Sequence, residues 1–280
     1  MRFYQILMLL TVSVLAVACS SGQSTRDKEE QARIELESKS AEEIYQEAMA
    51  DADKGLYINA AKMFNEVERL YPYSDLAPKA QLQAAYAYYK SGKYDDAVIG
   101  LDRYIQLYPG SDDLDYAYYL RALNYYDQIV NVERDQAMTE SALDNLNLLI
   151  NRFPDSRYAR DAEYKRDLTM DHLAGKEMEI GRYYLTRGYY QAGINRFMNV
   201  VEKYQTTTHV PEALHRLVES YLALGIEIEA YRVAAVLGHN YPGSPWYEDT
   251  YKLLDPKQRQ KLLNDRSFVD KAVETIFRPQ

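Results

Sequence analysis

The sequence predicts an all-α protein, a solenoid built from about five consecutive helix pairs. Three observations lead to this prediction: a pattern that recurs at an offset of 37 residues, few residues that break helices, and small residues at fixed places in each repeat. The chain has 12 glycines and 9 prolines among 280 residues, fewer than a turn-rich all-β chain or a disordered linker contains. Hydrophobic residues make up 47% and charged residues 27%, which is ordinary for a chain that buries a core.

The first element is an N-terminal targeting segment. Residues 1–18 combine one arginine, a mostly apolar run over residues 6–18 and small residues directly before Cys19. This pattern is typical of a secretory signal peptide, and the run is shorter than the roughly 20 apolar residues that span a membrane. Cys19 is the only cysteine, so no intramolecular disulfide can form.

The residues before Cys19 resemble the lipobox of bacterial lipoproteins, because positions 15–18 read Leu-Ala-Val-Ala. This resemblance implies that Cys19 is the lipidated mature N-terminus, and Ser20 in place of aspartate implies sorting to the outer membrane. The chain would then touch the membrane through its lipid anchor only. Residues 19–39 are polar and charge-rich, which indicates a tether.

The folded body, residues 40–254, carries the repeats. An aromatic or aliphatic residue and a proline end the units, as in Leu-Tyr-Pro at 70–72 and again at 107–109. The five predicted units lie near residues 41–72, 78–109, 113–154, 174–205 and 211–242. The net charge of −9 lacks the basic excess of nucleic-acid binders, so nucleic acid is excluded as a partner.

The spacing within a unit resembles the tetratricopeptide pattern, which implies a right-handed α-solenoid. Small residues allow the two helices of a unit to approach closely, and glycine between them can adopt the left-handed conformation that ends a helix. The small residues are Ala48, Ala85, Ala122 and Gly181 in first helices and Ala60, Ala97, Ala142, Gly193 and Ala230 in second helices; Val218 is the large exception. The glycines between helices are Gly55, Gly92, Gly188 and Gly225.

Two stretches depart from the repeat. About eight residues around 130–135 are inserted within the third unit, and residues 156–173 are sufficient for an additional helix before the fourth. Ser244 and Pro245 then begin a short helix. The tail, residues 255–280, has a weak apolar pattern that is compatible with capping the solenoid, with docking on a partner and with disorder.

Residues with catalytic or metal-binding spacing are absent from the sequence. The four histidines, at positions 172, 209, 215 and 239, form no pair spaced four residues apart for a metal on one helix face. Nucleophile, phosphate-binding and dinucleotide motifs do not occur. We therefore expect no catalytic residue, no metal and no cofactor, and not an enzyme.

Binding residues are expected on the inner wall of the solenoid, which the first helix of each unit lines. Tyrosine recurs at these positions, and its rigid ring with a hydroxyl tip suits binding surfaces. The predicted groove residues are Tyr45, Tyr71, Lys79, Tyr86, Tyr89, Lys90, Tyr116, Tyr119, Arg121 and Tyr126, with Met49, Leu82 and Leu123 beside them. Lys79, Lys90 and Arg121 could receive a terminal carboxylate.

Longer motifs resemble a particular family. Residues 71–74, 86–90, 102–105, 115–121, 181–188 and 195–197, together with the lipobox and the five units, look like the BamD family of the outer-membrane β-barrel assembly machine. The resemblance implies that the N-terminal units bind unfolded outer-membrane proteins. It also implies that the C-terminal half binds a POTRA domain of BamA through Arg187 and Arg196. Other barrel-assembly lipoproteins are further implied partners.

One other function fits the same sequence, and a third is disfavoured. A general periplasmic tetratricopeptide scaffold would join envelope or cell-wall proteins without handling substrates. A lytic enzyme on a helical solenoid would need a compact catalytic domain after the repeats, and the sequence offers none.

Overall fold

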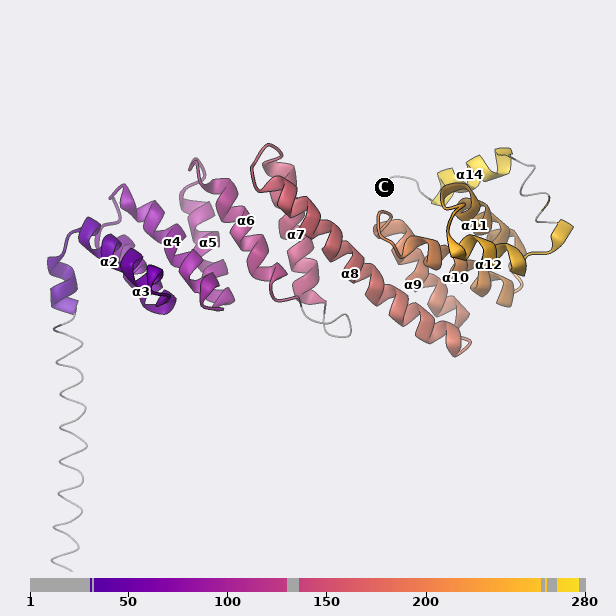
Figure 1. Cartoon of the computed structure of the whole chain (residues 1–280), viewed down its shortest axis with the longest axis horizontal. Coiled ribbons are helices and arrows are strands. Elements are labelled where there is room, and N and C mark those ends of the chain that lie inside the picture. Colours follow the sequence, from indigo (N-terminus) through magenta and orange to yellow (C-terminus); the bar gives the residue numbers. More distant parts are fainter. Residues whose placement is uncertain (1–30, 32, 130–135, 258–259, 261–265, 277–280) are drawn as a thin grey trace, which may run out of the picture. The chain divides into compact units, whose positions relative to one another are not determined.

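A computed structural model describes residues 31, 33–129, 136–257, 260 and 266–276. The chain divides into two compact units, residues 1–117 and 118–280, and each is described by itself (Figure 1). The signal peptide, Cys19, most of the tether and the insertion at 130–135 lie outside the described residues. Within the described ranges, no helix is long and apolar enough to cross a membrane.

The described residues form helices and no strand, which confirms the all-α prediction. The first unit contains α2 (Ala41–Asp53), α3 (Tyr57–Leu70), α4 (Leu76–Lys90) and α5 (Tyr94–Leu107), and α6 (Leu114–Tyr126) begins at its end. The second unit contains α7 (Ala137–Arg152), α8 (Ala159–Thr186), α9 (Tyr190–Lys203), α10 (Val210–Ala223), α11 (Glu227–Asn240), α12 (Pro245–Leu253) and α14 (Arg266–Ile276). Consecutive helices pack against each other in pairs such as α2 with α3 and α10 with α11.

Helix ends follow from local chemistry. Ser40 caps α2 in a capping box: its side chain accepts from the Glu43 backbone, and the Glu43 carboxylate accepts from the Ser40 backbone. The glycines between paired helices have φ between 73° and 78°, the left-handed region that a side chain disfavours: Gly55, Gly92, Gly188 and Gly225. The sequence predicted these four turns.

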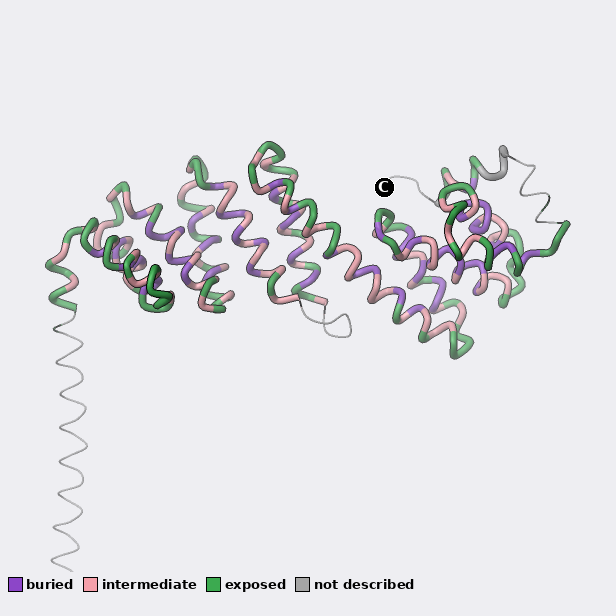
Figure 2. Tube along the Cα trace, in the orientation of Figure 1, coloured by how far each residue is buried: buried purple, intermediate pink, exposed green. Residues whose placement is uncertain are grey.

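Each unit has its own core. Buried residues recur along one side of each helix, as the purple segments of Figure 2 show. In the first unit the core forms around Ile44, Phe64 and Val67. In the second it includes Met178, Phe197 and Leu214 among other fully buried residues. The small residues predicted at helix crossings are buried, for example Ala48 and Ala60 at 0% exposure.

Helix α8 differs from the prediction. A separate helix over residues 156–173 was expected before the fourth unit, but α8 runs unbroken over Ala159–Thr186 and serves as both. No proline occurs in this range, and its glycines, Gly175 and Gly181, do not adopt positive φ. Nothing local therefore ends the helix before Gly188.

The described part of the tail belongs to the second unit. Helix α14 packs against α11, with Ala272 buried at 2% exposure and Val273 beside the core. This packing is the contact expected if the tail caps the helices before it, which is one of the three alternatives that the sequence left open.

A buried histidine network joins α12 to α10. The Nδ1 atom of His215 lies 2.8 Å from the Thr250 hydroxyl, and its ring lies 5.1 Å from Trp246. On the other side, His215 Nε2 is 3.6 Å from Glu219, which also accepts from Arg216 at 2.7 Å. The pKa of Glu219 is lowered to about 2, first by His215 and then by Arg216, against the opposing effect of burial.

This network predicts acid sensitivity of the second unit. A carboxyl whose pKa is lowered in the folded state adds stability above its unfolded pKa, and the contribution is lost as the pH falls toward the folded value. We expect Glu219→Gln to lower the free energy of unfolding at pH 7 by about 1–3 kcal/mol, a range reduced for partial solvent exposure. The deficit should shrink between pH 5 and pH 3, measured by urea unfolding followed by Trp246 fluorescence. A deficit that stays constant over this range would contradict the assignment.

Candidate functional site

The predicted groove residues of α4 share one face of that helix. Lys79, Tyr86 and Lys90 are seven and four residues apart, a spacing that aligns side chains along a helix. Both lysines are exposed and Tyr86 is half-buried. The ring of Tyr86 lies 6.5 Å from that of Tyr89, which lies 6.1 Å from that of Tyr94 at the start of α5. The three rings form an aromatic row, named here the α4 row.

Two other predicted tyrosines of the first unit are tied to its core. Tyr45 meets Phe64 edge-on at 5.3 Å, and burial raises the pKa of Tyr45. Tyr71 packs beside the same core, and its hydroxyl donates to the carbonyl of Lys39. Leu82, expected beside Tyr86 in the groove, is only 6% exposed, so that expectation is wrong. Tyr116 is half-buried at the end of this unit.

In the second unit, α6 and α8 form a polar aromatic cluster. Tyr119 stacks on Tyr158 at 4.7 Å with an interplanar angle of 16°, and its hydroxyl donates to Asp161 at 2.6 Å. Lys165 also donates to Asp161 at 2.6 Å, and its Nζ lies 5.6 Å from the ring of Tyr126. Burial would raise the pKa of Asp161, but the hydrogen bonds from Lys165 and Tyr119 lower it overall.

The sequence missed Tyr158, Asp161 and Lys165 as members of this cluster. The only local signal was the four-residue spacing of Asp161 and Lys165, which is common on exposed helices. Arg121, predicted as a carboxylate receptor, lies over the ring of Tyr118 at 4.9 Å. This contact orients its guanidinium along the aromatic surface of α6.

The two arginines predicted to contact BamA differ in their surroundings. Arg187 is exposed and lies over the ring of Tyr183 at 4.2 Å. Arg196 pairs with Glu177 at 3.2 Å, and Asn199 donates to the same carboxylate at 3.1 Å. The Arg196 side chain nevertheless keeps 39% of its surface exposed, against 19% for Glu177. Its remaining donors can therefore face a partner.

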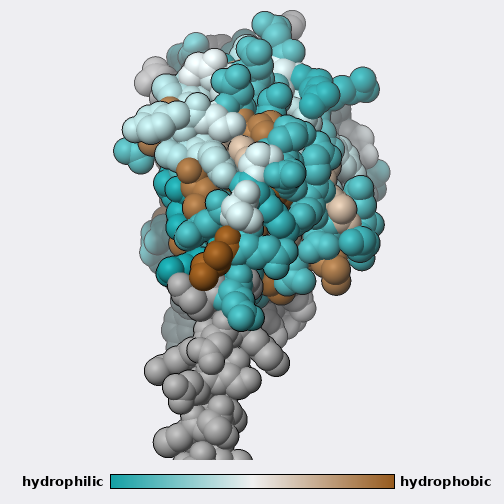
Figure 3. Space-filling view, turned by 90° about the vertical axis from the view of Figure 1, so that its left-hand side faces the viewer, coloured by the Kyte–Doolittle hydropathy of each residue, from teal (hydrophilic) through white to brown (hydrophobic). Residues whose placement is uncertain are grey.

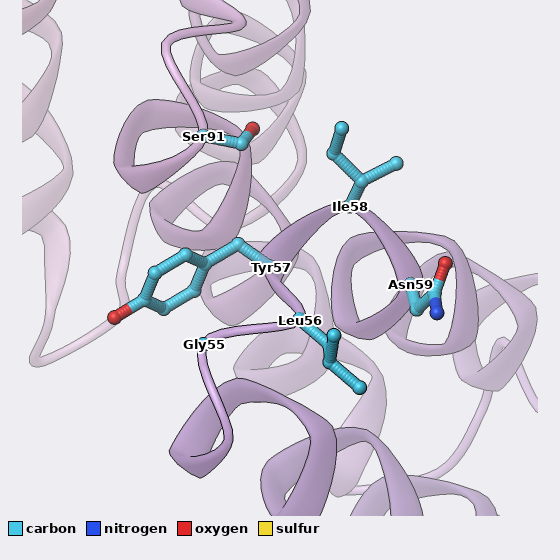
Figure 4. A pocket seen from close by; sticks show the side chains of 6 residues that line it. All are labelled: Gly55, Leu56, Tyr57, Ile58, Asn59 and Ser91. Atoms are coloured by element: carbon cyan, nitrogen blue, oxygen red, sulfur yellow. The ribbon is translucent and has the colours of Figure 1, made fainter.

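The turn between α2 and α3 carries a small pocket that sequence reasoning did not single out. It holds about 290 Å³ and is lined by residues 55–59 and Ser91 (Figure 4). Leu56 and Ile58 are 47% and 44% exposed there. Seen from the end that carries α2 and α3, apolar side chains gather in small groups among hydrophilic ones (Figure 3). In the part of the chain that the structure describes, no three His, Cys, Asp or Glu side chains converge as a metal site.

Comparisons with known proteins find a matching family and similar relatives. The family described as YfiO, outer membrane lipoprotein, matches residues 37–237. The outer membrane protein assembly factor BamD of Caulobacter vibrioides is 44% identical over 91% of this chain and 83% of its own length. BamD of Rickettsia prowazekii is 44% identical over 75% of this chain and 84% of its own.

A third relative has a lower sequence identity, and the match again covers most of both chains. BamD of Neisseria meningitidis serogroup B is 34% identical over 87% of this chain and 94% of its own length. The match to the family and these relatives together show that the chain belongs to the YfiO family of outer membrane lipoproteins, which includes the outer membrane protein assembly factors BamD.

Proposed function

We propose that this chain is a non-enzymatic outer-membrane lipoprotein of the β-barrel assembly machine. A lipid on Cys19 anchors it to the periplasmic face of the outer membrane. Its N-terminal repeats bind unfolded outer-membrane proteins, and its C-terminal half binds a POTRA domain of BamA alongside other barrel-assembly lipoproteins. Family membership and the name shared by the relatives, outer membrane protein assembly factor, support the general role.

The α4 row is the observation that supports substrate binding best. A strand of an outer-membrane barrel presents apolar and aromatic side chains on its lipid-facing side. Tyr86, Tyr89 and Tyr94 offer rings for these side chains, and phenol hydroxyls can form hydrogen bonds with an unpaired strand backbone. Lys79 and Lys90, exposed on the same helix, are positioned to attract the terminal carboxylate of the substrate.

The second unit adds a comparable surface at α6 and α8. Tyr119 and Tyr126 lie beside the Asp161 and Lys165 pair, so aromatic rings and polar groups occur together. In this proposal Tyr116, Tyr119, Tyr126 and Arg121 also contact substrate. Tyr45 and Tyr71 contribute less, because much of their surface is used within the first unit.

Arg196 and Arg187 are the proposed contacts for BamA. Both lie in the second unit, and the partly exposed guanidinium of Arg196 can donate to an acidic side chain of BamA while it still holds Glu177. The pair with Glu177 also gives Arg196 a role within the fold, and the experiment must separate these two roles.

A charge exchange achieves this separation. We expect Arg196→Glu to abolish co-purification of BamA, because the reversal places two negative charges against each other across the interface, which costs several kcal/mol. In the double variant Arg196→Glu with Glu177→Arg, the internal pair is restored in the opposite orientation, so stability should recover while BamA binding remains lost. Recovery of BamA binding in the double variant would assign Arg196 a structural role only. If the single variant Arg196→Glu still co-purified with BamA, Arg196 would not be a contact for BamA.

A further inference from the structure

The first unit has a second, larger hollow that the proposed function does not use. It holds about 590 Å³ and lies between α3 and α5, with residues of α4 at its base. Its lining combines an apolar wall, including Pro72 and Ile99, with three carboxylates and two arginines. Ile99 is 66% exposed, a large value for an isoleucine in a folded unit. None of the predicted groove residues lines this hollow.

A missing side chain at Gly100 contributes to the hollow. The equivalent positions in the other units hold Met63, Asn145, Arg196 and Val233. A Cβ at Gly100 would lie 3.5 Å from the Cβ of Ala85, an ordinary contact, and the residue lies within the α5 helix without positive φ. Neither backbone conformation nor close packing requires glycine here. The glycine instead leaves space beside the hollow that it lines.

Gln81 lies at the base of this space with an unsatisfied oxygen. Its side-chain nitrogen donates to the carbonyl of Gly100 at 3.4 Å. This contact fixes the orientation of the amide, because the flipped amide would place Oε1 against the Gly100 carbonyl oxygen and the two oxygens would repel. The residue is 3% exposed, and its Oε1 has no hydrogen-bond partner among the described residues. The oxygen is itself buried, so a donor in the hollow reaches it only after a small side-chain movement. A buried acceptor without a donor costs about 1–3 kcal/mol, and such a donor would remove this cost.

The charges around the hollow also favour a donor. Arg69 pairs with Glu66 at 2.6 Å and Arg103 pairs with Glu68, which neutralises both cations. Asp96, exposed in the first turn of α5, has no ion pair among the described residues. One negative charge is left over, beside an apolar wall and an acceptor.

We propose that this hollow binds an arginine side chain presented by an extended partner polypeptide. The aliphatic stem packs on Ile99 and Pro72, and the guanidinium donates to Gln81 Oε1 and to the carboxylate of Asp96. A guanidinium carries five donors and no acceptor, which matches a site rich in acceptors. This binding surface lies outside the proposed groove, so its test does not depend on substrate binding by the α4 row.

Three peptides added to the full chain test the proposal: acetyl-Ala-Arg-Ala-amide and its analogues with citrulline or norleucine in place of arginine. We expect the arginine peptide to shift the NMR signal of the Ile99 δ1-methyl group saturably. The norleucine peptide should bind at least about tenfold more weakly because it lacks donors, with citrulline between them because it lacks charge. Equal binding of arginine and norleucine, or no saturation, would overturn the proposal.

Variants locate the binding. Gly100→Met restores the methionine of the preceding unit and should abolish the shift, with its fold checked by thermal unfolding. Asp96→Asn should weaken arginine binding about three- to tenfold. Asp95→Asn is the matched control, since Asp95 is exposed in the same turn but does not line the hollow. Unchanged binding in both Gly100→Met and Asp96→Asn, or an equal loss in Asp95→Asn, would contradict the site.

Discussion

Replacing Gly181 by alanine should destabilise the second unit by about 2 kcal/mol, although alanine favours helix. A Cβ at Gly181 would lie 2.4 Å from Phe197 Cε1 and 2.8 Å from two more atoms of the same ring. Phe197 is fully buried, so its ring cannot move aside without disturbing the core of α8 and α9. Urea unfolding followed by Trp246 fluorescence reports on this unit, because the only tryptophan packs against the same core.

Gly100 provides the matched control for Gly181. It is also a helical glycine, but its added Cβ would meet only ordinary contacts. We expect Gly100→Ala to stabilise the protein by up to about 1 kcal/mol through helix propensity, measured by urea unfolding and circular dichroism. If Gly181→Ala were as stable as wild type, the close packing of α8 on α9 at Gly181 and Phe197 would be contradicted.

Replacing both Tyr86 and Tyr89 by alanine should weaken binding of an outer-membrane protein's C-terminal strand about 30-fold or more. Tyrosines central to an interface cost about 2 kcal/mol or more when truncated, and about 1.4 kcal/mol corresponds to tenfold in affinity. The measurement is fluorescence anisotropy of a labelled peptide with that strand's sequence, added to the full chain. Circular dichroism verifies that the helices remain.

Tyr73 is the control for this double variant. It lies in the same unit, is 100% exposed and is not among the predicted groove residues. Tyr73→Ala should change peptide affinity less than about twofold, as most exposed residues outside a binding site do. Wild-type affinity in the Tyr86 and Tyr89 double variant would show that the α4 row does not bind substrate.

The repeats could be predicted because each depends on local residues. Glycine at positive φ, small residues at helix crossings and a proline after the second helix act over a few positions, and the sequence displays all three. The continuity of α8 could not be predicted by counting repeats. It follows from the lack of a breaking residue before Gly188, so a search for helix-ending residues would have found it.

The candidate site was harder to predict because its contacts are distant in sequence. The Tyr71 hydroxyl reaches the carbonyl of Lys39, 32 residues earlier, and the Tyr119 hydroxyl reaches Asp161, 42 residues later. Helix periodicity tells which face a tyrosine occupies, but not whether another element already covers that face. For this reason Tyr86 and Tyr45, both predicted on the inner wall, differ in the structure, where Tyr45 packs against Phe64.

Depletion of the protein from the bacterium that produces it tests the central proposal most directly, with the amounts of many β-barrel proteins in the outer membrane quantified by mass spectrometry. An assembly factor that handles unfolded outer-membrane proteins predicts that these barrels decline together, before cell-wall composition changes. Normal barrel levels with a cell-wall or division defect would contradict this function and would instead support a periplasmic scaffold.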